Sequence, residues 1–415
     1  MKVGAAQVEI SPTVPVELCG FALREHPCVG VEAPIFARAV YLEHAGEKLL
    51  MIVCDVIALD TETVLRVRRW AEQALGLEPR QVMLAATHTH SAPATVSLFS
   101  AGACSESYVQ FLEEQMCRVA GAAVESAELA DVVSARVSLE LAIDRRDQPS
   151  AHTDPWVWGV GFKRADGSFI AAMINYAMHP VAHGHVQRQV SPDWCGAAAE
   201  SVASLLRCDV ATVTTGAAGN LNPPFLNEPW SAVKALGQRV AAAIAPALRT
   251  AAPQREALRV VSRSVALPLE AHDQAGVDAV ADRELVKIDP SWAWRDLYRS
   301  AVQQWREKMK QEVAAGRGES VEIEIQVTKI GEVYLVAING EIFSRFTDLL
   351  RQRTGKDLFV VAYANAAFGY VPTRQAYAEG GYEVDQAHFF YGSFRPRIGG
   401  LEMLVNHAAE IINAM

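Results

Sequence analysis

The sequence predicts an α/β protein in which a layered mixed sheet is flanked by helices. Short apolar runs typical of strands alternate with segments whose apolar residues recur at helical spacing. Turn residues join some strands into hairpins, whereas a helix between other strands indicates a βαβ connection. Hydrophobic residues make up 50% of the 415-residue chain, which is enough for a sizeable core.

Capping residues and turns delimit the elements in the first half of the chain. Asp60 or Thr61 caps a helix that stops at Gly76, and Ser105 begins a second long helix. Strands are expected over residues 3–10, 34–43, 48–55, 82–86, 132–143, 157–163, 168–176 and 210–214, and further helices over 194–206 and 230–247.

The second half of the chain predicts more strands and a helical insertion. Strands are expected over 257–269, 321–330, 333–339 and 358–364, and helices over 341–353 and 400–414. Residues 272–318 are helical and charged, with Pro290 dividing them, and they form an insertion that either covers a pocket or builds the interface of a homo-oligomer. Because no repeat and no linker marks a boundary, residues 1–415 are expected to form a single domain.

The charge and the cysteines restrict the class of protein. The formal net charge is -10 and no basic run is present, which excludes a nucleic-acid partner on electrostatic grounds. No stretch approaches the roughly 18 apolar residues of a transmembrane segment, and we see no signal peptide. The 7 scattered cysteines argue against a disulfide framework. We therefore expect a cytoplasmic protein.

The motif His88-Thr89-His90 follows the apolar run 82–86 directly. In an extended backbone, side chains two residues apart point to the same side, so both imidazoles would project from the end of a buried strand. Ligands bind beyond the carboxyl ends of strands in open α/β sheets, so the pair is a candidate metal or acid/base site. The alternative is one solvated histidine and one bonded to the backbone.

Other chemically capable residues also follow predicted strands. His179 comes after the strand 168–176, and Glu341 either caps the next helix or offers a hard oxygen ligand. Asp193 is either a helix N-cap or a catalytic group, and Tyr370 is either a packing residue or part of a site. Arg145 is either a surface residue or orients a carboxylate or carbonyl.

The ordered set of these motifs resembles the catalytic N-terminal domain of the neutral/alkaline (non-lysosomal) ceramidases. The order and approximate spacing agree from the first strand to about Gly392, in a short form without the C-terminal β-sandwich of larger ceramidases. The motifs that carry the resemblance are Thr87-His88-Thr89-His90-Ser91-x-Pro93, Asn175…His179-Pro180, Gly219-x-x-x-Pro223, Gly340-Glu341-x-Phe343 and Asn365…Tyr370.

The resemblance implies a ceramidase-like zinc-dependent hydrolase that cleaves an amide (N-acyl) bond of a small-molecule or lipid-like substrate by a zinc-activated water. It implies a non-ligand role for His90 in proton transfer, shared or replaced by Asp193, and a substrate-orienting role for Arg145. Asn222 stands where the family has a serine, which favours a polar or oxyanion contact over a serine nucleophile. The implied Zn²⁺ ligands are His88, His179, Glu341 and Tyr370.

Two alternatives to this function remain open. The same metal site suits a carboxylic esterase or a phosphoesterase. A catalytically silent protein that binds an acyl or sugar ligand is the second alternative, and the asparagine at position 222 motivates it.

Overall fold

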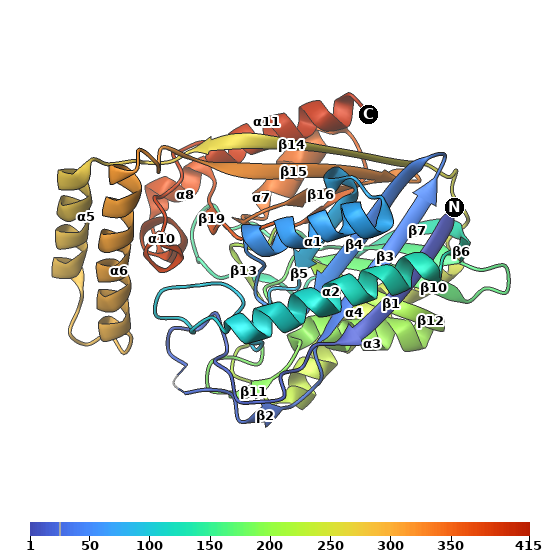
Figure 1. Cartoon of the computed structure of the whole chain (residues 1–415), viewed down its shortest axis with the longest axis horizontal. Coiled ribbons are helices and arrows are strands. Elements are labelled where there is room, and N and C mark those ends of the chain that lie inside the picture. Colours follow the sequence, from blue (N-terminus) through green and yellow to red (C-terminus); the bar gives the residue numbers. More distant parts are fainter. Residues whose placement is uncertain (25) are drawn as a thin grey trace.

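Three mixed sheets with helices packed over them build the protein (Figure 1). The computed structural model describes residues 1–24 and 26–415. The sheets have the strand orders β5-β4-β3-β1-β6, β12-β10-β9-β7 and β14-β15-β16-β18. In each sheet antiparallel neighbours are combined with one parallel pair: β4 with β5, β10 with β12, and β16 with β18. The expected α/β class with mixed pairing and flanking helices is confirmed, with the strands divided among three sheets.

The strand bounds follow the apolar runs of the sequence. The first sheet holds β1 (Lys2–Glu9), β3 (Phe36–His44), β4 (Glu47–Cys54), β5 (Val82–Ala86) and β6 (Glu128–Leu129). The second holds β7 (Asp131–Ser138), β9 (Trp156–Lys163), β10 (Phe169–Tyr176) and β12 (Cys208–Thr215). The third holds β14 (Leu258–Pro268), β15 (Ser320–Ile330), β16 (Val333–Ile338) and β18 (Leu358–Val361). Short pairs are formed by β2 (Gly30–Val31) with β11 (Gln189–Val190), β8 (Ile143–Asp144) with β13 (Leu221–Asn222), and β17 (Glu341–Ile342) with β19 (Tyr370–Val371).

Most of the helices pack over the sheets, and several begin or end at a residue that caps them. Asp60 accepts a hydrogen bond from the Thr63 backbone N–H at the start of α1, and Gly76 ends this helix with φ 64°. Ser105 caps α2 in the same way. The longer helices are α1 (Thr61–Leu75), α2 (Glu106–Glu125), α3 (Asp193–Leu206), α4 (Trp230–Thr250), α5 (Gln274–Lys287), α6 (Arg295–Ala314), α7 (Arg345–Thr354) and α11 (Gly400–Asn413). Four short elements are the 3-10 turn η1 (Pro79–Gln81) and helices α8 (Arg374–Glu379), α9 (Tyr382–Asp385) and α10 (Ala387–Tyr391).

Buried asparagines tie the sheets together at their carboxyl ends. Asn175 at the end of β10 donates to the Val360 carbonyl of β18 at 2.8 Å. Asn365 accepts from the Leu84 backbone N–H of β5 at 3.0 Å, and Ala85 and Ala364 form an isolated bridge beside it. Because a buried amide has to find partners, these contacts fix the mutual position of strand ends that are remote in sequence.

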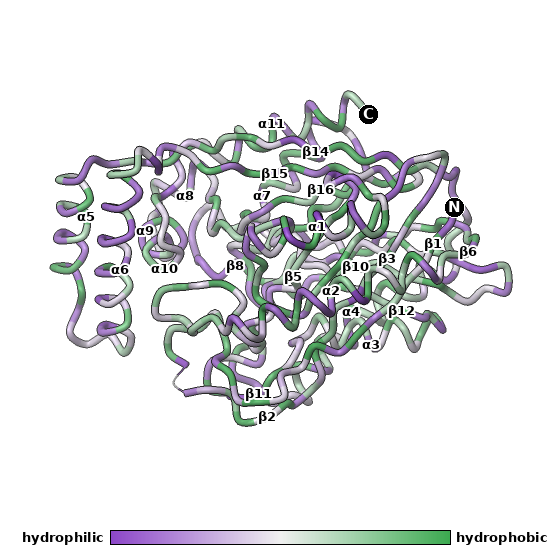
Figure 2. Tube along the Cα trace, viewed as in Figure 1, coloured by the Kyte–Doolittle hydropathy of each residue, from purple (hydrophilic) through white to green (hydrophobic). Residues whose placement is uncertain are grey.

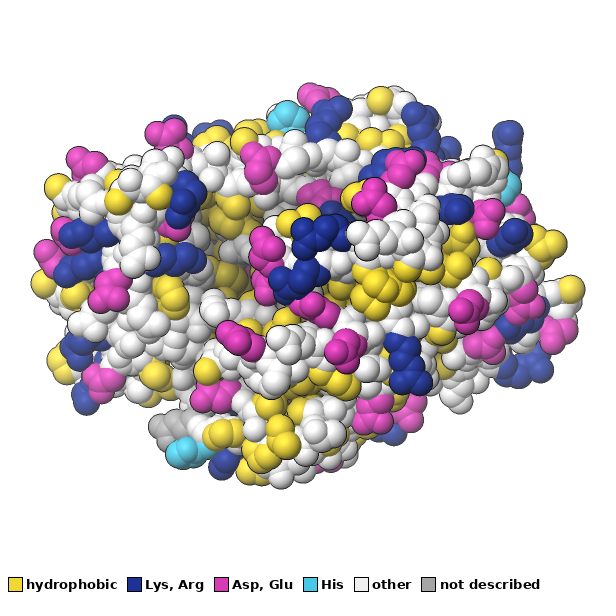
Figure 3. All heavy atoms as spheres, viewed as in Figure 1, with side chains coloured by type: hydrophobic (Ala, Val, Ile, Leu, Met, Phe, Trp, Pro, Cys, Tyr) yellow, Lys and Arg dark blue, Asp and Glu magenta, His cyan; other side chains and the backbone are white. Residues whose placement is uncertain are grey.

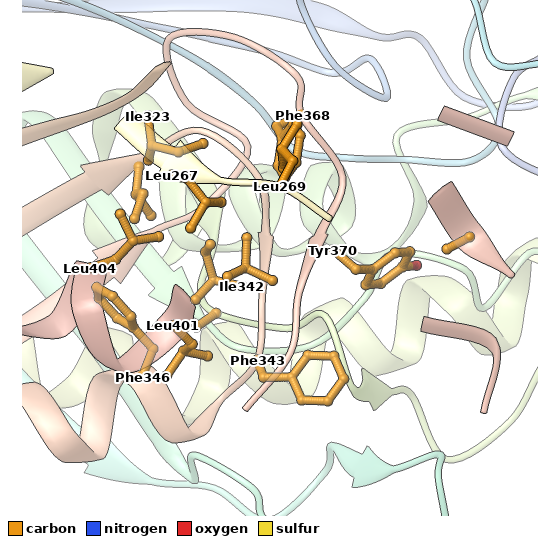
Figure 4. Packing of buried hydrophobic residues seen from close by; sticks show 14 of the residues in the cluster. Leu267, Leu269, Ile323, Ile342, Phe343, Phe346, Phe368, Tyr370, Leu401 and Leu404 are labelled. Carbon is orange, nitrogen blue, oxygen red and sulfur yellow. The ribbon is translucent and has the colours of Figure 1, made fainter. Parts of the chain in front are cut away.

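The apolar core lies between the sheets and their helices. Figure 4 shows Leu267 and Ile323 of the third sheet packed against Leu401 and Leu404 of α11, with Tyr370 at the margin and its oxygen directed away from the aliphatic side chains. Figure 2 shows that the central strands are largely hydrophobic, whereas much of α6 is hydrophilic. The apolar side of α6, with Tyr298, Val302 and Trp305, nevertheless belongs to the same core cluster as Leu267 and Leu401.

The insertion predicted at 272–318 consists of α5 and α6 and stands at one end of the molecule (Figure 1). Trp305 and Tyr298 of α6 are buried against Phe389 of α10. Trp292 and Trp294 stack with ring centroids 4.9 Å apart. These aromatic side chains pack the insertion onto its neighbours.

Two predicted elements differ from the structure by more than three residues at one end. The strand expected over 132–143 leaves the sheet after Ser138, because the backbone N–H groups of Leu141 and Ala142 donate to the Tyr176 hydroxyl instead. The helix expected over 341–353 begins only at Arg345, because Glu341 and Ile342 pair in parallel with β19.

The surface is polar and of mixed charge. Figure 3 shows acidic and basic side chains interspersed over one face, with hydrophobic side chains between them. Among the described residues, no helix has the length and apolar character needed to cross a bilayer.

A matched pair of glycine substitutions tests the local backbone. Gly76→Ala is expected to destabilise the protein by about 1 kcal/mol, because φ 64° is unfavourable for a side chain although its Cβ meets open space. Gly121→Ala, inside α2 and also open, is expected to stabilise by about 0.5–1 kcal/mol. Thermal unfolding midpoints should therefore shift in opposite directions. A shift of the same sign in both variants would contradict the left-handed cap.

Candidate metal centre

The carboxyl ends of the three parallel pairs meet at one buried point. His88 follows β5, His179 follows β10, and Glu341 follows β16. All three side chains are almost completely buried. Their convergence follows from topology, because parallel neighbours end at the same edge of a sheet and the asparagine contacts bring the three edges together.

The two histidines of the motif lie side by side, but not in an extended strand. Strand β5 ends at Ala86, and His88 has a left-handed backbone with φ 68°. A non-glycine residue in this region costs about 1–2 kcal/mol, so the surrounding contacts have to hold it. The His88 backbone N–H donates to the Val56 carbonyl at 2.9 Å. This backbone conformation places His88 Nε2 and His90 Nε2 3.3 Å apart.

Backbone carbonyls fix the tautomers of the two buried histidines. His88 Nδ1 lies 2.6 Å from the Ile57 carbonyl, and His179 Nδ1 lies 3.2 Å from the Ala218 carbonyl. A carbonyl only accepts, so each Nδ1 carries the proton and each Nε2 presents a lone pair. Glu341 Oε2 lies 3.4 Å from His88 Nε2 and 3.6 Å from His179 Nε2. Three acceptors therefore face one another without a proton between them.

This arrangement fits a metal ion. Ligand atoms about 2.0–2.1 Å from a tetrahedral zinc lie about 3.3 Å apart, which is close to the separations observed here. His179 Nε2 is buried and has no hydrogen-bond partner among the described residues. Ligand nitrogens of His88, His90 and His179 all lie within 4.8 Å of one another. His90 is thus as close as the predicted ligands, although it was predicted to be a non-ligand.

Burial and neighbouring charges keep the site in its metal-binding protonation state. Burial lowers the pKa of both His90 and His179 well below the usual value. Burial alone would raise the pKa of Glu341, but neighbouring groups that include the Tyr391 hydroxyl and Arg145 hold it below its usual value. Neutral imidazoles and an ionised carboxylate are the forms that bind metals.

Arg145, Tyr370 and Asn222 lie together beside this centre. The register of β17 and β19 places Tyr370 opposite Glu341. Arg145 donates to the Tyr370 hydroxyl at 3.0 Å and to Asn222 Oδ1 at 3.3 Å, and Glu383 accepts from its Nε at 2.7 Å. Burial raises the pKa of Tyr370 well above the usual value, and Arg145 opposes that rise.

A pocket of about 280 Å³ opens onto the centre. It is lined by five of the predicted residues (His90, Arg145, Asn222, Glu341 and Tyr370) and by apolar side chains that include Phe21, Leu98, Leu226, Trp294 and Phe390. Trp294 belongs to the loop before α6, so the insertion contributes to the wall of the pocket, which is one of the two roles left open for it. The absence of a side chain at Gly20 lets its backbone lie close to the His90 ring, because a Cβ there would be only 2.5 Å from His90 Nδ1.

Asp193 does not line this pocket. Its carboxylate accepts the backbone N–H groups of His183 at 2.9 Å and Trp194 at 2.7 Å. It is the first residue of α3, and Pro192 occupies the N-cap position that was predicted for Asp193. Burial raises the pKa of Asp193 to about 6 against these hydrogen bonds. The structure therefore gives Asp193 a role in holding the loop that follows His179.

Two tyrosines of the centre were not predicted from the sequence. Tyr391 donates a short hydrogen bond to Glu341 Oε1, and Tyr363 donates to Oε2 at 3.5 Å. Tyr363 also stacks on His88, with ring centroids 3.8 Å apart. Tyr363 lies just past β18, so its place after a strand was a usable signal, whereas Tyr391 at the end of α10 offered none.

The fold and the site define an α/β protein with a buried histidine and carboxylate cluster at its strand ends. The structure is similar to that of neutral ceramidase from Pseudomonas aeruginosa, with a TM-score of 0.75 and 18% identity over 100% of this chain and 75% of that chain. A ceramidase complexed with C2 gives a TM-score of 0.74 and 17% identity with the same coverage. The chain therefore has the neutral ceramidase fold, as its motifs predicted. No protein-family model and no curated protein matches the sequence.

Elemental analysis of the purified protein tests the centre. We expect about one zinc ion per chain, and His179→Ala or Glu341→Gln should weaken zinc binding by at least the ~10–100-fold that loss of an outer-shell partner costs. His407→Ala is the control, because this histidine pairs with Glu410 on α11 and lies outside the centre. Equal metal content in all four proteins would contradict the assignment.

Proposed function

We propose that this protein is a metal-dependent hydrolase that cleaves the C–N bond of a neutral N-acyl amide. The observation that carries the proposal is the meeting of His88 Nε2, His179 Nε2 and Glu341 Oε2 beside an apolar pocket. The similarity of fold to neutral ceramidase supports amide cleavage as the reaction.

His88, His179 and Glu341 would hold Zn²⁺, with Tyr370 as the fourth ligand because the β17–β19 register sets it beside Glu341. Zinc, when bound, supplies a water of lowered pKa and polarises the substrate carbonyl. Tyr391 and Tyr363 donate to the two oxygens of Glu341 and so fix the orientation of this ligand. The Ile57 and Ala218 carbonyls do the same for the two histidines.

His90 is proposed to carry the proton from the attacking water to the leaving amine. It lines the pocket, whereas His88 and His179 lie behind the pocket wall. Because burial lowers its pKa, the His90 imidazole is neutral near pH 7 and is free to accept a proton. The Arg24 guanidinium bonds the His90 carbonyl at 2.6 Å and holds the residue in place.

Arg145 is proposed to orient the amide carbonyl and to stabilise charge that develops on its oxygen. Glu383 accepts from Arg145 Nε and offsets its charge. A dianionic phosphoester would therefore find little net positive charge from the chain, which favours a neutral amide. Asn222 Oδ1 accepts from Arg145 and thus helps to position this guanidinium.

The pocket supports a substrate with an apolar acyl part. Phe21, Leu98 and Phe390 give it apolar walls. Both of its charged lining groups have partners, because Arg145 donates to Glu383 and Glu341 accepts from the Tyr391 hydroxyl. A lipid-like or small-molecule amide is therefore the proposed substrate class.

A substrate panel tests the reaction class. We expect the protein to hydrolyse short N-acyl amides, to lose the activity in the presence of a chelator, and to regain it on addition of Zn²⁺. Carboxylic esters and phosphoesters of the same acyl or alkyl length should be poorer substrates by kcat/KM. If the protein cleaves phosphoesters faster than amides, the proposed amidase activity is wrong and a phosphoesterase activity takes its place. Bound metal without any hydrolysis would indicate a ligand-binding protein.

His90→Gln separates proton transfer from metal binding. If His90 moves a proton, kcat/KM should fall by ~10²–10⁴ while the metal content stays at the wild-type level. A parallel loss of metal and activity would make His90 a ligand and contradict the proposed role. The measurements are steady-state hydrolysis of the best amide and elemental analysis of the same samples.

A further inference from the structure

A second cleft lies next to the catalytic pocket and is formed by residues that alternate with those of the pocket. Arg145 and Asn222 line the pocket, whereas Asp144, Arg146 and Asn220 line a cleft of about 510 Å³. We call it the arginine cleft, because it is also lined by Arg345 at the start of α7 and Arg374 at the start of α8. Nothing in the proposed hydrolysis uses this cleft.

The cleft presents more hydrogen-bond donors than the protein satisfies. The Arg374 guanidinium forms no hydrogen bond or ion pair with any described residue, and Arg345 has only the exposed Asp348 as a partner, at 3.3 Å. Arg146 is 5% exposed, and its Nε has no partner within the described part of the chain. Of these three arginines only Arg146 is buried, and a buried donor without a partner is uncommon because it costs about 1–3 kcal/mol. Arg345 and Arg374 are exposed, so their remaining N–H groups are open to a ligand.

The acidic groups of the cleft do not satisfy these donors. Asp144 already accepts three N–H groups, from the Arg146 and His152 backbones and from Asn220 Nδ2. Glu402 accepts the Arg374 backbone N–H at 3.0 Å through Oε1, while its buried Oε2 is unpartnered among the described residues. The cleft therefore combines two exposed guanidinium groups, those of Arg345 and Arg374, with two buried atoms that have no partner among the described residues, Arg146 Nε and Glu402 Oε2.

The helix dipole of α7 favours an anion in the cleft. This helix begins at Arg345 without a side-chain cap, so its positive end lies at the lining of the cleft, although the Phe346 and Thr347 N–H groups already bond the Phe343 and Ser344 carbonyls. Glu379 and Glu383 neutralise Arg146 but lie outside the lining, so the groups that a ligand would meet carry three positive and two negative charges.

We propose that the arginine cleft is a binding site for a small polar molecule that carries an oxyanion, carboxylate or phosphate, and at least one hydrogen-bond donor. The oxyanion is held by the guanidinium groups of Arg374 and Arg345, which match its planar array of acceptors. The donor of the ligand is accepted by Glu402 Oε2. This assignment does not depend on the proposed hydrolysis.

Three simple probes test the site by thermal unfolding of the full chain at constant ionic strength. Inorganic phosphate tests the phosphate form and glycolate tests the carboxylate form, and both carry a donor. Acetate carries a carboxylate without a donor. We expect saturable rises in the unfolding midpoint with phosphate, glycolate or both, and a weaker response to acetate. Arg374→Gln should raise the apparent Kd of the better probe by about tenfold or more.

Arg353→Gln is the matched control, because Arg353 also lies on α7 but does not line the cleft. The rise in its unfolding midpoint with each probe should equal that of the wild type. Arg345→Gln, like Arg374→Gln, should raise the apparent Kd of the better probe. Glu402→Gln should remove the preference for glycolate over acetate. Equal responses of Arg374→Gln and the wild type, or no saturable response to any probe up to about 100 mM, would overturn the proposal.

Discussion

The meeting of three lone pairs at one buried point is the constraint on which the site depends. His88 and His179 each commit Nδ1 to a backbone carbonyl, so neither ring is free to turn its Nε2 away from Glu341. Acceptors held this close repel one another unless a cation lies between them. The left-handed backbone of His88 shows that the protein accepts a conformational cost to keep this arrangement.

The strand pairing within the three sheets brings these ligand atoms together. Each carries one parallel pair, and the strand ends of those pairs deliver His88, His179 and Glu341. Antiparallel neighbours alone would return the chain to the opposite edge after every hairpin. Asn175 and Asn365 then fix the three edges against one another. The fold thus places residues that are distant in sequence at the adjoining carboxyl ends of the three sheets.

Much of this was predictable because it follows local patterns. Asp60, Gly76 and Ser105 delimit helices where their capping chemistry says they should, and apolar runs locate the strands. The proximity of His88 and His90 was also predicted, but for the wrong reason, since a left-handed turn and not an extended strand brings them together. The features that could not be predicted from the sequence depend on tertiary contacts.

Long-range pairing decides the remaining features. Glu341 leaves its predicted helix because β19, far along the chain, offers a partner strand. Tyr391 reaches Glu341 only because α10 packs beside the pocket. The arginine cleft likewise joins segments near 146, 345 and 374 that no periodicity connects.

The proposed ligand set has a consequence for stability, because three of its four members, His88, His179 and Glu341, follow strands of three different sheets. A cation bound by all of them would stabilise the folded state of the whole chain by thermodynamic linkage, because the unfolded chain does not form the site. At a free concentration of ~1,000 Kd it would add about 4 kcal/mol to the free energy of unfolding, so loss of the ion would loosen the junction of the sheets and not only the pocket.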